Sequence, residues 1–283
     1  MKRLKFSYDM ILSFDSVIRE HHFTVKCQPG DDERQKIISL NISVSPNDFT
    51  SKTVDSFGNR CIYGYMSGEH DRFMIHAEGL AECGLKDTAP GDEKPTGLYK
   101  YQTGLTKPGE GIRGFHNNIL RKYKEQLNLR YAKSAEAEMG SNDCEGNVKD
   151  WAAFIMNELY GYMKYVPGST TVTSTAEEAF EQGEGVCQDY AHIFLGLLRL
   201  DRIPCRYVVG FLKGEGRSHA WCEVLTKEGI YAFDPTNNVL VDDEHIKVSC
   251  GRDYEDCLIN KGVFKGNAAQ LGTISVVVEE VKA

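Results

Sequence analysis

The stretch GEGVCQDYAHIFLGLLRL, residues 183–200, decides the fold, because it places a cysteine between a glycine-containing turn and a long apolar run. The run from Cys187 to about Leu200 is predicted to be a helix that is apolar nearly all round, and such a helix is normally buried in a core. Cys187 would then start a rigid, central element. Serine or aspartate would cap a helix better than cysteine does, so the thiol needs an explanation of its own.

Two interpretations of Cys187 are open on the residues alone. A thiolate at a helix N-terminus is stabilised by the positive end of the helix dipole, which suits a nucleophile. A buried and inert cysteine is the ordinary alternative. The chain has nine cysteines, an odd number at scattered spacings with no Cys-x-x-Cys pair, so the signatures of zinc ribbons and thioredoxins are absent. We therefore expect neither a metal nor a cofactor.

A cysteine nucleophile needs a base and a third group that orients the base. RSHAWCEVL (217–225) places His219 at the head of a predicted strand, and GIYAFDPT (229–236) places Asp234 at the end of the next one. If these strands pair in antiparallel fashion, His219 and Asp234 can be neighbours on one face. Strand alternation then turns Cys222 to the other face, as a core residue. Asp234 alone would equally suit the end of a strand, because Pro235 follows it.

The motifs GEGVCQDYAH, IPCRYVVGFL, SHAWCEV and AFDPTNN, in this order, resemble the core of the bacterial transglutaminase-like superfamily, whose members share a papain-like fold. The likeness continues in HIKVSCGRDYEDC and GVFKG, and DSFGN is similar to the β-rich domain that precedes this core. The resemblance implies that Cys187 is the nucleophile, His219 the base and Asp234 the orienting acid. Cys222 stands where an aliphatic residue is expected, which leaves the triad intact. The backbone N–H of Cys187 would donate to the oxyanion.

The chain as a whole is expected to be α+β. Residues 1–83 are predicted to form a β-sandwich-like domain, because RQKIISLNISVSP (34–46) alternates and turn signals separate the runs. Residues 84–145 are predicted to be a linker and helical connection. Residues 146–283 are predicted to be the transglutaminase-like core, with the Cys187 helix packed on an antiparallel sheet. A capping box of Thr175 with Glu178 predicts a short helix, and TISVVVEEV (273–281) a last strand.

Charge and hydropathy exclude several partners. The net charge is −8, from 33 basic and 41 acidic residues, which argues against nucleic acid or anionic membranes as partners. No apolar run approaches the roughly 18 residues of a membrane span. The apolar residues of MKRLKFSYDMILSFDSV (1–17) are interrupted by polar ones, so we expect no signal peptide. We expect a cytoplasmic location. The expected partner is a peptide or other amide substrate, and the oligomeric state is open.

Other polar residues are weaker candidates. Gln182 and Tyr165 could reach the oxyanion but are expected to be structural or surface residues. His192 is expected on another side of its helix than the thiol. The remaining candidates lack metal-ligand spacing or are expected in a solvated loop: His21, His22, His70, His76 and the segment 242–245.

Two chemistries follow from the implied acyl-enzyme. Water resolves it in a cysteine peptidase or amidase, and an amine resolves it in a transglutaminase. We favour hydrolysis, because an amine acceptor would need a recognition site that the sequence does not reveal. A non-enzymatic binding module with a papain-like fold is the third alternative, although such a protein would usually have lost one of the three triad residues.

Overall fold

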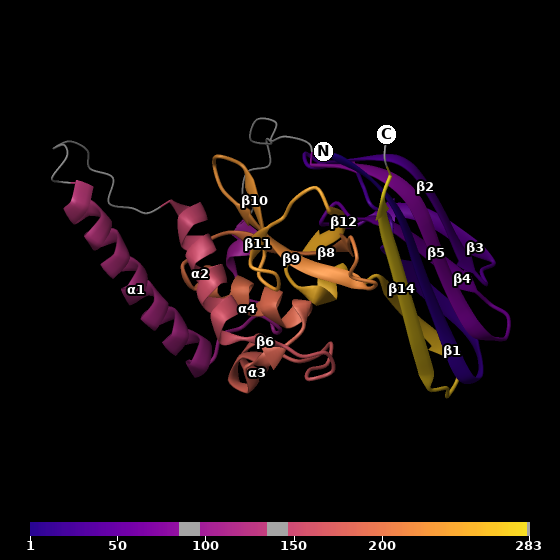
Figure 1. Ribbon diagram of the computed structural model, residues 1–283. Helices are drawn as coiled ribbons and strands as arrows, with labels where there is room; N and C mark the ends of the chain where they lie inside the picture. Colours follow the sequence, from indigo (N-terminus) through magenta and orange to yellow (C-terminus); the bar gives the residue numbers. More distant parts are fainter. Residues whose placement is uncertain (85–96, 135–146, 282–283) are drawn as a thin grey trace. The chain divides into compact units, whose positions relative to one another are not determined.

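The computed structural model describes residues 1–84, 97–134 and 147–281 (Figure 1). Helices and antiparallel sheets give the α+β class that the sequence predicts. Contacts between Cα atoms divide the chain into two compact units, which are Met1–Gly91 with Val208–Ala220 and Val241–Ala283, and Asp92–Tyr207 with Trp221–Leu240. Cys144 and much of the predicted 84–145 connection lie outside the described residues, so the predicted domain boundaries stay predictions.

The first unit is built around one long strand, β1 (Lys2–Val25). Its residues alternate between core and solvent, as expected of a strand with one buried face. Tyr8 and Met10 are buried, whereas Asp9 and Ser13 are exposed. The polar residues that interrupt the apolar start of the sequence are therefore the solvent-facing positions of β1.

Two groups of strands pair with the two halves of β1. The first half pairs with β5 (His70–Cys83) and β14 (Gln270–Glu280), and β2 (Gln35–Ser45) lies beyond β5. The second half pairs with β4 (Arg60–Met66) and β13 (Asn260–Lys265), and β3 (Phe49–Val54) lies beyond β4. Figure 1 shows yellow β14 running beside indigo β1, so the end of the described chain returns to its first strand. The predicted last strand is confirmed.

The described residues of the second unit form four α-helices and the 3₁₀ helix η1 (Gly97–Lys100). The α-helices are α1 (Glu110–Ser134), α2 (Val148–Tyr162), α3 (Ala176–Gln182) and α4 (Cys187–Leu200). Helix α4 is buried along almost its whole length, as its apolar sequence predicts. Asp201, at its C-terminal end, accepts hydrogen bonds from His116 on α1 and Trp151 on α2, both at 2.8 Å. This carboxylate joins three helices. None of the described helices is long and apolar enough to span a membrane.

A five-stranded sheet has the strand order β11-β10-β9-β8-β12. Its strands are β8 (Cys205–Leu212), β9 (Ser218–Leu225), β10 (Ile230–Asp234), β11 (Val239–Leu240) and β12 (His245–Gly251). A 3₁₀ helix, η2 (Tyr254–Cys257), follows β12. The short strand β7 (Glu184–Gly185) comes just before the Cys187 helix and pairs in parallel with β6 (Lys164–Tyr165).

Candidate active site

Cys187 is the first residue of α4, where the sequence places it. The N-cap residue is Val186, whose side chain has no acceptor. Asp189 takes over the capping function, because its Oδ2 accepts a hydrogen bond from the Val186 N–H at 2.8 Å. A carboxylate in the first turn also suits the helix dipole. The thiol can therefore occupy the helix start because a residue two positions further on satisfies the backbone there.

The cysteines differ in exposure. All eight described cysteines are free thiols; seven are buried, and Cys187 is partly exposed. Burial raises the pKa of the Cys27 and Cys83 thiols to about 12 and that of Cys205 to about 11. It also raises the pKa of Cys61, Cys222 and Cys257. Because the thiolate is the nucleophile, these buried cysteines are poor competitors for Cys187.

The other two triad candidates lie on neighbouring strands. His219 is the second residue of β9, is 1% exposed, and has its ring centroid 6.1 Å from that of His245. Asp234 is the last residue of β10 and is fully buried. Its carboxylate accepts hydrogen bonds from the Thr236 N–H at 3.0 Å and the Asn237 side-chain amide at 2.7 Å. The turn after β10 therefore fixes the orientation of this carboxylate.

The antiparallel pairing of β9 and β10 is confirmed, with Cys222 opposite Phe233. Both residues face α4, since the Cys222 Sγ lies 3.4 Å from the Ala191 carbonyl oxygen and Phe233 packs 5.7 Å from Phe194. Cys222 is thus a core residue, as predicted.

Strand alternation gives His219 and Asp234 the other face of this pair. That the Cys187 sulfur lies near a ring nitrogen of His219 stays a prediction.

The weaker candidates have structural surroundings. His192 is fully buried, its ring lies 5.1 Å from that of Tyr207, and burial lowers its pKa to about 3. Gln182 donates to the Ser169 carbonyl at 3.2 Å. Among the described residues, His219, Asp234 and His245 form the group whose side-chain atoms could hold a metal ion, since imidazole and carboxylate are both common ligands. The expectation from the sequence that the protein holds no metal stays a prediction.

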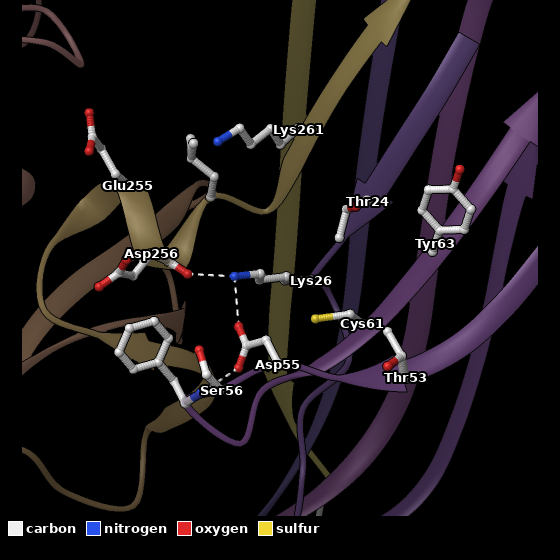
Figure 2. Close-up of a pocket in the computed structure, with 12 residues that line it drawn as sticks. Thr24, Lys26, Thr53, Asp55, Ser56, Cys61, Tyr63, Glu255, Asp256 and Lys261 are labelled. Atoms are coloured by element: carbon white, nitrogen blue, oxygen red, sulfur yellow. Dashed lines mark hydrogen bonds and ion pairs between the residues drawn. The ribbon is translucent and has the colours of Figure 1, made fainter. Parts of the chain in front are cut away.

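A cavity of about 530 Å³ in the first unit is a separate concave site (Figure 2). Lys26, whose side chain is 16% exposed, is held by the Asp55 carboxylate at 2.8 Å and donates to the Asp256 carbonyl at 2.6 Å. The cavity's one thiol, Cys61, is buried, and burial raises its pKa. The Cys61 thiol of this cavity is therefore a poor nucleophile.

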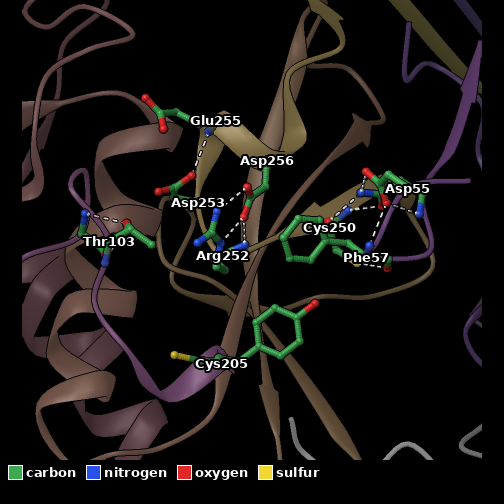
Figure 3. A network of polar contacts seen from close by, with 12 residues as sticks. Asp55, Phe57, Thr103, Cys205, Cys250, Arg252, Asp253, Glu255 and Asp256 are labelled. Carbon is green, nitrogen blue, oxygen red and sulfur yellow. Dashed lines mark hydrogen bonds and ion pairs between the residues drawn. The ribbon is translucent and has the colours of Figure 1, made fainter. Parts of the chain in front are cut away.

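The GRDYEDC motif next to this cavity is structural (Figure 3). Arg252 binds the Asp256 carboxylate through its Nε at 2.7 Å and its Nη2 at 2.9 Å. Asp253 caps η2 by accepting the Glu255 N–H at 2.9 Å. Asn59, from the DSFGN motif, accepts the Cys250 N–H at 2.8 Å. The Asn59–Cys250 bond joins β12 to the turn between β3 and β4, and the bonds of Arg252 and Asp253 hold the segment from the end of β12 to η2.

Two family models match the chain. The bacterial transglutaminase-like N-terminal region matches residues 4–82, and the transglutaminase-like superfamily core matches residues 142–235. The chain belongs to the transglutaminase-like superfamily. All three triad candidates of this transglutaminase-like protein lie within the matched core.

The chain is also similar to two mycobacterial proteins and to one solved structure. An uncharacterised protein of Mycobacterium leprae is 42% identical over 127 residues, which are 41% of this chain and 44% of that protein, so the match spans less than half of the relative. An uncharacterised protein of Mycobacterium tuberculosis is 27% identical over 85% of this chain and 80% of its own length. A crystal structure from Cytophaga hutchinsonii, described as a candidate cysteine protease, covers 100% of this chain and 91% of its own with a TM-score of 0.72 and 18% identity. This transglutaminase-like chain shares that fold.

Proposed function

We propose that this protein is a thiol-dependent acyl-transfer enzyme that acts on amide bonds and hydrolyses them. Cys187 is the nucleophile, His219 the general base and Asp234 the group that orients His219. The observation that carries the proposal is the position of Cys187, which is the one partly exposed thiol among the described residues and the first residue of a buried helix. Membership of the transglutaminase-like superfamily supports the same chemistry.

The reaction proceeds in two halves. His219 removes the thiol proton, the Cys187 sulfur attacks the amide carbonyl, and a tetrahedral oxyanion forms. The backbone N–H of Cys187 donates to this oxyanion from the helix start. The amine leaves with the proton from His219, and a thioester remains on Cys187. Water, deprotonated by His219, then attacks the thioester and releases the carboxylic acid.

Hydrolysis and transamidation differ in the second half alone, so one experiment separates them. The protein is incubated with a mixture of peptides and protein substrates, with and without a primary amine such as putrescine, and the products are identified by mass spectrometry. We expect new carboxyl termini or deamidated glutamine whether or not the amine is present. Amine-linked product as the sole outcome would contradict hydrolysis and assign a transglutaminase.

The same assay addresses a pure binding role. Cys187→Ala, compared with the wild-type protein, should yield no product while retaining its folded structure. A specific partner that is bound equally by both proteins, together with no turnover by either, would favour a binding module.

A further inference from the structure

The segment Tyr165–Thr175, with the sequence YVPGSTTVTST, is unusual for this chain. It contains no charged residue, although 26% of the chain is charged, and six of its eleven residues are serine or threonine. It leads from β6 to the N-cap residue of α3, Thr175. We call it the uncharged segment.

The uncharged segment is bound to the residues on both sides of Cys187. The Val166 N–H donates to the Gly185 carbonyl at 3.0 Å. Beyond the cysteine, Gln188 Nε2 donates to the Val172 carbonyl at 3.0 Å. The nucleophile's turn is thus attached to this segment at both ends.

Asp189 adds a third link and couples it to the helix start. Its Oδ2 accepts the Thr170 hydroxyl at 2.6 Å and also the Val186 N–H. Asp189 is 1% exposed, so both hydrogen bonds to its carboxylate lie in the protein interior. A Cβ atom at Gly185 would lie 2.7 Å from the Cβ of Asp189, which explains the glycine just before the Val186–Cys187 pair. The same buried carboxylate therefore fixes both the backbone at Cys187 and the uncharged segment.

The outer side of the uncharged segment is open to solvent. Val172 is 57% exposed, and Thr171 and Thr173 beside it are exposed as well. The Val172 carbonyl touches the side chain of Gln188, the residue after Cys187, so Val172 lies within roughly 10 Å of the Cys187 backbone by chain geometry. Residues 171–173 therefore form an uncharged, solvent-exposed surface near the Cys187 turn.

We propose that the uncharged segment is a wall of the acyl-donor site and selects donors that are uncharged next to the reacting amide. The inference rests on the proposed role of Cys187 as nucleophile. A charged donor group placed against this wall would lose part of its hydration and find no charged side chain within the segment itself. A neutral peptide segment would lose little and could use the hydroxyls. Val172 is the specificity-determining residue at the centre of the wall.

Charged thiol reagents test this proposal without knowledge of the substrate. Alkylation of Cys187 is measured by mass spectrometry with neutral iodoacetamide, anionic iodoacetate and cationic 2-bromoethylammonium, each rate being divided by the rate with free cysteine. The wild-type protein should favour iodoacetamide. Val172→Lys should raise the rate with iodoacetate relative to iodoacetamide about two- to tenfold at low salt, and Val172→Glu should do the same for the cation. Both effects should shrink at about 1 M salt, where the Debye length is about 3 Å.

Two further variants make the outcome decisive. Leu129→Lys places the same charge on an exposed position of α1 and should leave the three relative rates unchanged. Thr170→Val removes one link of the segment to Asp189 and, combined with Val172→Lys, should reduce the charge effect. Unchanged relative rates in both Val172 variants would overturn the wall while leaving the proposed function intact. Failure of Cys187 to react faster than the buried cysteines would instead overturn the proposed function.

Discussion

At the scale of single residues, Cys187 differs from the other described cysteines because its side chain is partly exposed to solvent. This exposure distinguishes it in addition to its sequence neighbours. We expect iodoacetamide at neutral pH to label Cys187 first, because burial raises the pKa of six of the seven other described thiols. Peptide mapping after timed alkylation measures this directly. Equal labelling of Cys187 and a buried cysteine such as Cys27 would remove the main support for the nucleophile.

The triad predicts a matched pair of catalytic losses. Cys187→Ala should abolish turnover, a loss on the order of 10⁴-fold or more, and His219→Ala should cost nearly as much, because such residues act as a unit. The melting temperature of each variant is the control. Cys222→Ala is the comparison variant, since Cys222 is buried against α4 and should affect stability but not chemistry. A His219→Ala enzyme with near-normal turnover would show that another group is the base.

At the scale of secondary structure, Glu177 links the start of α1 to α3. Its carboxylate accepts hydrogen bonds from the Gly109 and Gly111 N–H groups, each at 2.6 Å. These are donors that a helix start leaves without an intrahelical partner. Glu177→Ala should therefore lower the free energy of unfolding by about 1–2 kcal/mol. Urea unfolding of this variant, compared with Glu181→Ala on the exposed side of the same helix, measures the difference. Equal effects of the two variants would contradict the linking role.

Much at this scale follows from the sequence, because helices and strands are local patterns. The apolar run predicts α4, the alternation of β9 predicts that Cys222 is buried, and the Thr175–Glu178 capping box is present as predicted. The role of Asp189 was not predictable, because its partner Thr170 is 19 residues away and belongs to a loop without periodicity. From the sequence, Asp189 indicated only a favourable interaction with the helix dipole. The pairing of β14 with β1 joins the two ends of the chain, and no local pattern reports such a pairing.

At the scale of the whole molecule, each unit contains a buried histidine whose protonation in acid favours unfolding. In the first unit His21 is 2% exposed, its Nδ1 lies 3.2 Å from the Nε2 of His70, and its ring packs 4.8 Å from Phe73. Burial, with added repulsion from His70 and His22, lowers the pKa of His21 from 6.5 to about 4. In the second unit burial lowers the pKa of His192 to about 3. Both units are therefore expected to lose stability in acid.

The sign and the pH window of this loss follow from linkage. The unfolded chain takes up a proton at His21 near pH 6.5, whereas the folded chain does so only near pH 4, so protons favour unfolding between these values. The contribution of His21 to the free energy of unfolding is complete above pH 6.5. It falls by about 3 kcal/mol as the pH drops to 4. Carboxylates whose pKa is lowered in the folded protein, such as Asp55, cause a further loss of stability when the pH falls below their unfolded pKa of 3.8. Urea unfolding at pH 7, 6, 5 and 4.5 should show the histidine loss first.

The variant His21→Gln isolates the contribution of the first unit. Glutamine can still donate to the Nε2 of His70 but does not titrate, so the variant should be less stable at pH 7 and lose less stability between pH 6.5 and 4.5. His76, whose side chain is 38% exposed and contacts the Asp9 carboxylate at 2.7 Å, gives the matched control, because His76→Gln makes the same substitution at a much less buried position. The decisive quantity is the slope of unfolding free energy against pH, since the absolute stability of the variant also reflects altered packing. If the slope for His21→Gln equals that of the wild type, burial of a neutral His21 does not limit the acid stability of this unit.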